Sequence, residues 1–337
     1  MQLADWPRAQ GLPKVSGVLK ARPEDFVVEE VFDLEFSDDG EFDWLWIEKC
    51  GDNTEYVARQ LARVAGVQPR AVTYSGQKDR HAVTRQWFCV HLPGKNKPQW
   101  VVPENESWKI LRQGRHRQKL RLGSHRYNRF ILRLTDLTGD LADLEARLPI
   151  AGQGFPNYFG EQRFGHGGGN IDACRQWFAG DLSPGRFDRG MYLSAARSLI
   201  FNTVLAARVN AENWQRGLDG DVFSLRDSGS VFLAEIDADI VQRLSEGDIH
   251  PSGPLYGSAS KVAVSGAVAQ LEEKVFGEFA DLCAGLLKNN LTMERRALRT
   301  VPKDLQWQQI DKQSIELAFS LPRGCFATAL VRELIHY

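Results

Sequence analysis

The stretch GQKDRHAVT, residues 76–84, directly follows the apolar run Ala71–Tyr74. The apolar run predicts a strand that leads into a glycine-led turn, and glycine can adopt backbone angles closed to other residues. The turn places one acid, Asp79, between the bases Lys78 and Arg80. Flanking cations favour an ionised carboxylate and attract a polyanion. Asp79 is therefore a candidate reagent, although the same spacing also suits an ordinary solvated ion pair.

The composition is that of a globular protein without a global affinity for polyanions. The chain has 337 residues, of which 43% are hydrophobic and 25% charged, and its formal net charge is −1. This length predicts about two domains, and affinity for nucleic acid has to come from a local patch. The N-terminus lacks an apolar signal core, and no stretch is apolar for long enough to span a membrane. We therefore expect a cytoplasmic protein without membrane contact.

The first part of the chain predicts strands around one helix. Asn53 offers an N-cap and Gly66 a stop, so residues 54–65 should form a helix. In the strand before it, Leu45 and Ile47 should face one side and the aromatic residues between them the other. We expect extended segments at residues 25–36, 42–49, 71–74, 87–91 and 120–134, the last broken at Gly123.

The middle of the chain predicts mainly helices. Seven glycines between Gly152 and Gly169 mark a change in composition, which is consistent with a change of domain. Apolar residues at helical spacing follow them. We expect helices at residues 191–210, 237–247 and 268–287, then a strand at 315–321 and a last helix ending near Ile335. Strands at both ends of a helical middle indicate an insertion within one domain, whose final strand and helix return after the insert.

A basic segment, residues 107–135, is the strongest electrostatic feature. It contains no acid and nine bases: Lys109, Arg112, Arg115, Arg117, Lys119, Arg121, Arg126, Arg129 and Arg133. Such a segment neutralises phosphates, and aromatic side chains within it can stack on unpaired bases. The candidates for stacking are His116, His125, Tyr127 and Phe130. The alternative is a solvated basic hairpin.

Other chemistries find little support in the sequence. The glycine cluster at 165–169 matches neither the dinucleotide fingerprint nor the phosphate-binding loop of nucleotide hydrolases. The seven histidines show no metal-ligand spacing with one another or with the five cysteines, which form no Cys-x-x-Cys pair. No Gly-x-Ser-x-Gly elbow supports a serine nucleophile. We therefore predict no metal and no nucleotide cofactor, and we expect reduced, mostly buried thiols.

Longer motifs run in order over nearly the whole chain and resemble the TruD family of tRNA pseudouridine synthases. They are KARPEDF (20–26), GQKDRHAVT (76–84), NRF (128–130), PNYFGEQRFG (156–165), SAARSLIFN (194–202) and LPRGCFATALVREL (321–334). The resemblance implies an α+β protein with the pseudouridine synthase fold, a mixed and mostly antiparallel sheet with helices. It implies a catalytic domain at residues 1–154 and 304–337, and an inserted, mainly helical α+β domain at residues 155–303.

The same resemblance implies the reaction, the isomerisation of uridine 13 of tRNA, notably the glutamate tRNA, to pseudouridine without a cofactor. Asp79 matches the catalytic aspartate, and Lys20 would keep it ionised. Phe130 would stack on the uracil, and Phe26, Asn128 and Phe326 would line the uridine site. The basic residues Arg115, Arg117, Lys119 and Arg121 would grip the tRNA. No protein partner is implied, so we expect a monomer.

Two alternatives use the same residues differently. A non-catalytic RNA-binding or RNA-folding protein would need the basic segment but not Asp79. Another RNA-modifying enzyme, such as a methyltransferase, would need a cofactor pocket, which the glycine cluster does not fit.

Overall fold

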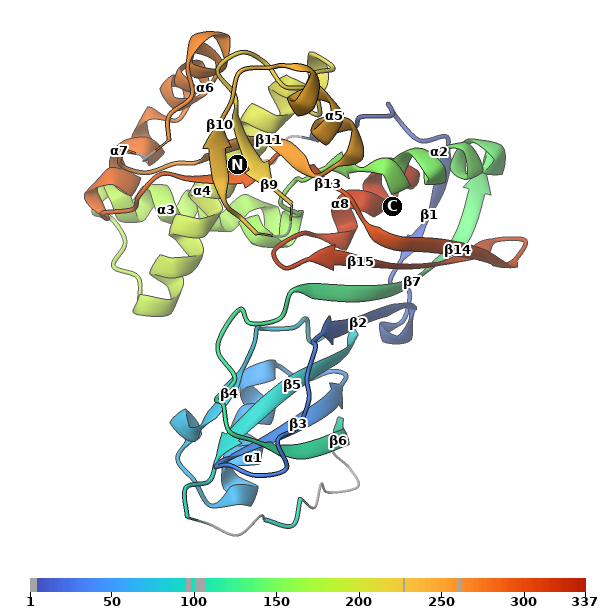
Figure 1. The fold of residues 1–337 in the computed structure, drawn as a ribbon, viewed down its shortest axis with the longest axis vertical. Helices are drawn as coiled ribbons and strands as arrows, with labels where there is room; N and C mark the ends of the chain where they lie inside the picture. Colours follow the sequence, from blue (N-terminus) through green and yellow to red (C-terminus); the bar gives the residue numbers. More distant parts are fainter. Residues whose placement is uncertain (1–4, 95–97, 101–106, 227, 260–261) are drawn as a thin grey trace. The chain divides into compact units, whose positions relative to one another are not determined.

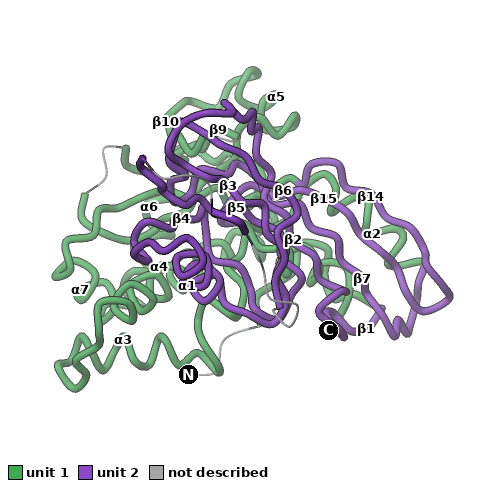
Figure 2. Tube along the Cα trace, turned by 90° about the horizontal axis from the view of Figure 1, so that it is seen from below, with its two compact units in different colours: residues 1–14, 142–301, 325–336 green, residues 15–141, 302–324, 337 purple. Residues whose placement is uncertain are grey.

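The chain forms two compact units. The computed structural model describes residues 5–94, 98–100, 107–226, 228–259 and 262–337. Unit 1 comprises residues 1–14, 142–301 and 325–336, and unit 2 comprises residues 15–141 and 302–324 with residue 337 (Figure 2). The limits of these units differ from the domain limits expected at 154/155 and 303/304, and those domain limits stay a prediction.

Unit 2 is built on a nine-stranded sheet with the main order β14-β15-β7-β2-β5-β3-β6, in which β1 also pairs with β7 and β4 with β5 (Figure 1). Its strands are β1 (Val15–Leu19), β2 (Phe26–Val31), β3 (Phe42–Lys49), β4 (Val72–Tyr74), β5 (Val83–His91), β6 (Trp108–His116), β7 (Tyr127–Gly139), β14 (Lys303–Asp311) and β15 (Ser314–Pro322). Only the β2–β5 pair is parallel among these strand pairs. The predicted mixed, mostly antiparallel sheet is confirmed.

Alternation along β3 gives the sheet two different faces. Leu45 and Ile47 pack in a cluster with Val57 and Leu61 of α1 (Thr54–Ala65). Burying each such side chain stabilises the fold by about 1.5–3 kcal/mol. Trp44, from the opposite face, belongs to a second, aromatic cluster. The predicted helix is confirmed, and it ends where Gly66 adopts a left-handed φ of 62°.

Two predicted strands are shorter in the structure. β2 ends at Val31, because Phe32 and Phe36 leave the ladder and pack edge-on against Trp44 and Trp87. The extended segment expected from residue 120 begins only at Tyr127. In both places burial in the aromatic cluster replaces strand pairing, since that cluster also takes in Leu120.

Unit 1 combines helices with two small sheets. Its helices are α2 (Leu141–Gln153, whose first residue belongs to unit 2), α3 (Gly169–Ala179), α4 (Arg186–Asn210), α5 (Ala238–Glu246), α6 (Gly266–Glu278), α7 (Ala280–Lys288) and α8 (Ala327–Leu334). Its strands are β8 (Phe155–Pro156), β9 (Val222–Leu225), β10 (Val231–Leu233), β11 (Ile249–Leu255), β12 (Glu294–Ala297) and β13 (Arg299–Thr300). They form a sheet of order β10-β9-β11-β12 and the pair β13-β8.

Two of the expected helices differ from the prediction. α4 starts at Arg186, earlier than expected. The single helix expected over 268–287 is two helices, because Phe279 leaves helical geometry with φ −119° and ψ 35°. α5 agrees with its prediction to within a residue.

The end of the chain rejoins the sheet of unit 2. β15 pairs with β7 in a continuous register, in which Leu317 lies opposite Leu132 and Phe319 opposite Phe130. The return of the final strand to the first sheet is therefore confirmed. The last helix, α8, belongs to unit 1 instead.

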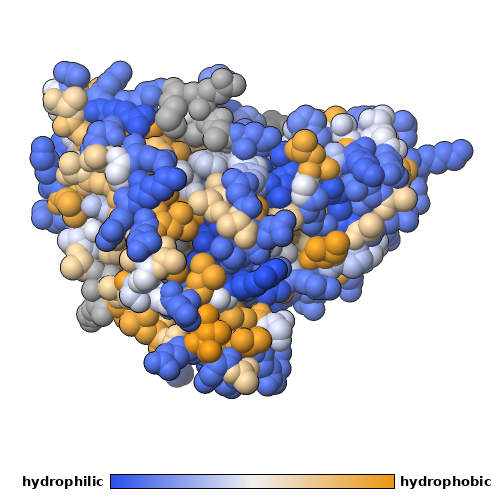
Figure 3. Space-filling model, turned by 90° about the horizontal axis from the view of Figure 1, so that it is seen from above, coloured by the Kyte–Doolittle hydropathy of each residue, from blue (hydrophilic) through white to orange (hydrophobic). Residues whose placement is uncertain are grey.

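The surface is polar over most of the face shown in Figure 3, where hydrophobic side chains gather only in small groups. In the described part of the chain, no helix combines the length and the apolar composition that a membrane span requires. All five cysteines are free thiols, and three of them are buried.

Candidate active site

Asp79 and Lys20 meet in unit 2, although they lie far apart in sequence. The Nζ atom of Lys20 donates a hydrogen bond to Oδ2 of Asp79, and both side chains are about a quarter exposed, at 24% and 25%. Lys20 follows β1 with a φ of 67°, in the left-handed region that non-glycine residues rarely adopt. Such strain persists where surrounding structure enforces it, often at functional sites. The ammonium also lies 5.1 Å from the ring centroid of Phe26.

The carboxylate of Asp79 is held in its ionised form. Burial raises the pKa of Asp79, but hydrogen bonds from Lys20 and from the main-chain N–H of His81, together with the charge of Lys20, lower the pKa by more. The N–H of His81 donates to Oδ1 at 2.9 Å. Both oxygens therefore have a donor, and Asp79 is a carboxylate at neutral pH.

The bases beside Asp79 in sequence do not pair with its carboxylate. Nζ of Lys78 points instead to the buried Glu30 and donates to its Oε1 at 2.6 Å, with side-chain exposures of 8% and 0%. Burial raises the pKa of Glu30, against the opposing charge of Lys78. Arg80 is exposed. The hypothesis that the flanking cations keep Asp79 ionised is wrong, because the cation that pairs with its carboxylate is Lys20.

Side chains from α1 and β5 hold the loop before Asp79. The hydroxyl of Thr54 accepts the main-chain N–H of Lys78 at 3.0 Å and donates to Oε1 of Gln86 at 2.9 Å. Nε2 of Gln86 in turn donates to the carbonyl of Gly76 at 2.8 Å. Gly76 itself does not have a positive φ, so the expectation that it supplies unusual backbone angles is wrong. The loop is fixed by these hydrogen bonds.

Lys49, at the end of β3, also holds this loop through hydrogen bonds to its main chain. Its side chain is 1% exposed. Its Nζ donates to three main-chain carbonyls, those of Asp52 at 3.0 Å, Lys78 at 3.4 Å and Asp79 at 3.1 Å. Burial lowers the pKa of Lys49 to about 8. The sequence reasoning missed this residue, although a lysine on the same strand face as Leu45 and Ile47 was a usable signal.

Three of the residues predicted for the uridine site, Phe26, Asn128 and Phe130, lie on the neighbouring strands β2 and β7. Phe130 stacks on Phe319 with ring centroids 5.5 Å apart and meets the edge of Phe26 at 6.3 Å. Phe130 is only 7% exposed, so stacking on a base requires the ring face that Phe319 leaves uncovered. Oδ1 of Asn128 is buried and has no hydrogen-bond partner among the described residues. A buried amide oxygen of this kind is suited to a ligand N–H.

Phe326 belongs to unit 1, at the N-cap of α8. It packs edge-on against Phe159, with ring centroids 5.7 Å apart, and lies 5.8 Å from the guanidinium of Arg163. The structure therefore gives Phe326 an aromatic and cationic neighbourhood of its own.

The predicted RNA-binding residues are not all unpaired cations. Arg115 pairs with the buried Asp43 at 3.2 Å, and Arg117 with Asp39 at 2.7 Å. Lys119 and Arg121 are exposed. The basic segment contains no acid of its own, but acids from earlier strands and loops neutralise part of it.

His125 and Phe130 are less available for stacking than the sequence suggests. His125 is 7% exposed and its Nδ1 bonds with the hydroxyl of Ser75. Burial, with the charges of Lys78 and Arg323, lowers the pKa of His125 to about 4, so the ring is neutral at pH 7. Burial and the hydrogen bond with Ser75 therefore argue against His125 as a base-stacking residue.

A row of alternating charges crosses five strands of the sheet. Glu29 pairs with Arg129 at 4.0 Å and also with Arg85. Arg85 pairs with Glu48 at 2.7 Å, and Glu48 with Lys109 at 2.8 Å. These contacts follow the strand register directly. The row accounts for two more bases of the basic segment as partners within the sheet.

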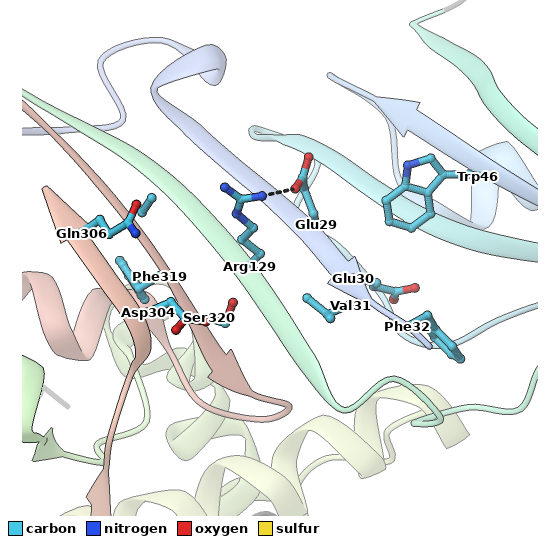
Figure 4. Close-up of a pocket in the computed structure, with 11 residues that line it drawn as sticks. Glu29, Glu30, Val31, Phe32, Trp46, Arg129, Asp304, Gln306, Phe319 and Ser320 are labelled. Atoms are coloured by element: carbon cyan, nitrogen blue, oxygen red, sulfur yellow. Dashed lines mark ion pairs between the residues drawn. The ribbon is translucent and has the colours of Figure 1, made fainter. Parts of the chain in front are cut away.

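A pocket of about 550 Å³ lies beside this row, and Figure 4 shows Arg129 directed toward Glu29 within it. Its lining comprises Glu29, Glu30, Val31, Phe32, Trp46, Arg129, Asp304, Gln306, Ala318, Phe319 and Ser320. Neither Asp79 nor Lys20 belongs to this lining. Because side chains alternate along a strand, Arg129 points to the opposite side of β7 from Asn128 and Phe130. Phe319, which stacks on Phe130, nevertheless borders this pocket, so the pocket and the predicted uridine-binding residues meet at that ring.

Comparison with known proteins places this architecture in one class. A solved structure described as a putative tRNA pseudouridine synthase D (TruD) from Methanosarcina mazei superposes with a TM-score of 0.69 at 20% identity, over 97% of this chain and 95% of that one. The fold is accordingly that of the pseudouridine synthases.

The family follows from the sequence comparisons. The family model described as tRNA pseudouridine synthase D (TruD) matches residues 8–171 and 187–334. A protein named tRNA pseudouridine synthase D from Pseudomonas fluorescens (strain Pf0-1) is 48% identical over 331 residues, covering 98% of this chain and 94% of that protein. One of the same name from Pseudomonas aeruginosa (strain LESB58) is 46% identical, covering 98% and 93%. The chain belongs to the TruD family.

Proposed function

We propose that this protein converts uridine 13 of tRNA, notably the glutamate tRNA, to pseudouridine, with Asp79 as the catalytic carboxylate. The observation that carries the proposal is an ionised Asp79, paired with Lys20 and held by the His81 N–H, on a loop anchored from three elements. The relatives named tRNA pseudouridine synthase D support the substrate class.

The reaction needs little more than such a carboxylate. The C1′–N1 bond breaks, the uracil turns, and C1′ joins to C5. The proton on C5 is released and N1 takes up a proton, so substrate and product are isomers. An ionised carboxylate either attacks C1′ as a nucleophile or removes a ribose proton to give a glycal. The target nucleotide has to leave its stack, which costs a few kcal/mol that aromatic and basic contacts offset.

The other site residues have distinct proposed roles. Lys20 keeps Asp79 ionised, and the unpaired Oδ1 of Asn128 accepts an N–H of the uracil. Phe26 and Phe130 offer ring surfaces to the base, and Phe326 lines the uridine site. Arg115, Arg117, Lys119 and Arg121 contact the tRNA, the first two by exchanging an acid partner for phosphate. A monomeric, cytoplasmic enzyme without a cofactor stays our prediction.

The test uses Asp79→Asn and tRNA labelled with tritium at uridine C5. We expect the variant to release no tritium above background while binding tRNA nearly as the parent protein does. The matched control is Asp136→Asn, which removes an exposed carboxylate of the same unit and should keep activity. Pseudouridine mapped at position 13, and lost from tRNA with cytidine there, tests the position. Tritium release by Asp79→Asn at the parent rate would refute the assignment.

The same experiment separates the second candidate function. An RNA-folding protein without catalysis would release no tritium even with Asp79 intact. Its effect on tRNA structure would be equal in the parent protein and in Asp79→Asn.

A further inference from the structure

Two arginines of unit 1 share one aromatic ring. Arg163 lies in the short helical turn 161–164 and Arg296 in β12. Their guanidinium carbons are 5.4 Å and 4.1 Å from the ring centroid of Phe159. The charge of Arg163 is close enough to contribute to a lowered pKa of Arg296, whose main cause is burial. Two like charges are thus held together in a partly buried place.

No carboxylate compensates these charges within the described residues. Nη1 of Arg163 donates to the hydroxyl of Ser194 at 2.9 Å, and Nη2 of Arg296 to Oδ1 of Asn157 at 2.6 Å. The thiol of Cys325 is the other polar group beside Arg296. The Nε atom of each arginine is buried and makes no hydrogen bond with the described part of the chain. Burying cations without an acid is unfavourable unless an anion binds there.

Two other buried arginines of the same unit pair with an acid, whereas the buried Arg299 donates to the main-chain carbonyls of Leu244 and Gln153. Arg208 pairs with Asp221 at 3.0 Å, and Arg295, the neighbour of Arg296, pairs with Glu272 at 2.8 Å. The pair Arg163 and Arg296 has no acid partner among the described residues and, unlike Arg299, remains partly exposed to solvent. An anion can therefore reach it.

The surroundings favour a nucleotide as the source of that anion. Phe326, partly exposed, lies 5.8 Å from the guanidinium of Arg163 and packs on Phe159. Arginine forks match the oxygens of a phosphate, and aromatic rings beside them match a base or a ribose. A Cβ at Gly160 would lie 2.9 Å from the hydroxyl of Thr328, so this glycine lets the segment before Arg163 approach α8.

We propose that Arg163 and Arg296 bind one phosphodiester group of the tRNA substrate, next to the nucleotide that contacts Phe326. The proposal rests on the proposed function, because Phe326 is assigned to the uridine site there. It predicts a single shared phosphate, because both guanidiniums lie against the ring of Phe159 and the charge of Arg163 acts on Arg296.

The first test measures tRNA affinity against salt concentration in an Asp79→Asn background, where the RNA stays unmodified. Arg163→Gln and Arg296→Gln should each weaken binding about tenfold or more at low salt. Each should reduce the slope of log affinity against log salt by about 0.7–0.9, and the double variant should reduce it no further. The matched control is Arg243→Gln, because Arg243 also lies over a phenyl ring but pairs with Asp248 at 2.7 Å. Its slope should equal that of the parent.

The second test changes the RNA instead of the protein, so its main result does not depend on whether a variant folds. Single uncharged methylphosphonate linkages are placed in turn around position 13 of the tRNA, and binding to the otherwise unaltered protein is measured. One linkage should weaken binding about tenfold, and the same linkage should have no effect on the folded Arg163→Gln variant. Parental slopes in both folded glutamine variants, or a scan without any sensitive linkage, would overturn the proposal. Formation of pseudouridine by the parent protein in either case would leave the proposed function standing.

Discussion

Replacing Lys49 by methionine should disturb the position of Asp79, and hence catalysis, with little change in the free energy of unfolding. Methionine keeps an unbranched chain in the buried space but removes the ammonium and its three hydrogen bonds to the carbonyls of Asp52, Lys78 and Asp79. Each of these hydrogen bonds contributes about 1 kcal/mol net, so their loss destabilises the fold by roughly 3 kcal/mol.

The buried charge acts in the opposite direction. Burial, with a further contribution from Lys78, lowers the pKa of Lys49 from 10.5 to about 8, while Asp79, Asp52 and Cys50 oppose the change. Below pH 8 the folded state therefore carries a proton at a cost of roughly 3 kcal/mol relative to the unfolded chain. Between pH 8 and 10.5 only the unfolded chain binds that proton, so this cost disappears as the pH rises. Lys49→Met removes it at every pH, and we expect the free energy of unfolding to change by less than about 2 kcal/mol.

Catalysis should respond much more strongly. Without the hydrogen bonds from Lys49 the main chain at Asp79 can move, and a displacement of about 1 Å lowers a rate by roughly 100-fold. We expect kcat of Lys49→Met to fall about 10- to 100-fold at saturating tRNA, with KM little changed. In the parent protein kcat should also decline above pH 8 as Lys49 loses its proton, and this alkaline decline should be absent from the variant.

The assay is tritium release at saturating tRNA from pH 6 to 9.5, with urea unfolding of the same samples. Lys109→Met is the matched control, because it removes one lysine charge paired with Glu48 at a side chain that is 64% exposed. It should retain the parental kcat. A folded Lys49→Met protein with kcat within twofold of the parent, or with the same decline above pH 8, would refute the reasoning.

Two further predictions concern the remaining ion pairs of unit 2. Lys20→Met removes the main donor to Asp79, so the pKa of Asp79 should rise and the acid limb of kcat should move to higher pH; an unmoved limb in the pH profile would show that Lys20 does not hold the charge. Arg85→Gln leaves Glu29 and Glu48 without their shared cation, and the free energy of unfolding should fall by about 1–2 kcal/mol at low salt and less at high salt, as measured in urea. A loss that does not depend on salt would contradict an electrostatic origin.

Sequence patterns predicted those helices and strands that depend on residues close together in the chain. α1 follows from an apolar stripe that ends at Gly66, and the two faces of β3 follow from alternation. The last strand was predictable for the same reason. Phe32 and Phe36 were assigned to a strand because their pattern suits one, but their burial partners, Trp44 and Trp87, come from other strands. Single-sequence patterns do not contain such partners.

The charge balance of the basic segment was unpredictable for a similar reason. Within residues 107–135 no acid is present, and the segment alone indicates a free polycation. The strand register brings Glu48 opposite Lys109 and Asp43 opposite Arg115. The order and register in which the strands pair therefore decide which cations have an acid neighbour and which remain available for a phosphate. No charge pattern marks Arg163 and Arg296 in the sequence, and the part of the chain that the structure describes gives neither of them an acid partner.

Three lysines surround Asp79, and their partners differ in a way that bears on its reactivity. Lys20 pairs with the carboxylate, Lys49 with main-chain carbonyls, and Lys78 with Glu30. A carboxylate paired with two ammonium groups would be ionised but a poor base and a poor nucleophile, because each cation lowers its pKa and its reactivity together. The ammonium of the adjacent Lys78 pairs with Glu30 instead, and the ammonium of Lys49 donates its hydrogen bonds to main-chain carbonyls. Among the described residues, Lys20 is thus the lysine that bonds with the Asp79 carboxylate, enough to keep it ionised whether it attacks C1′ or removes a proton.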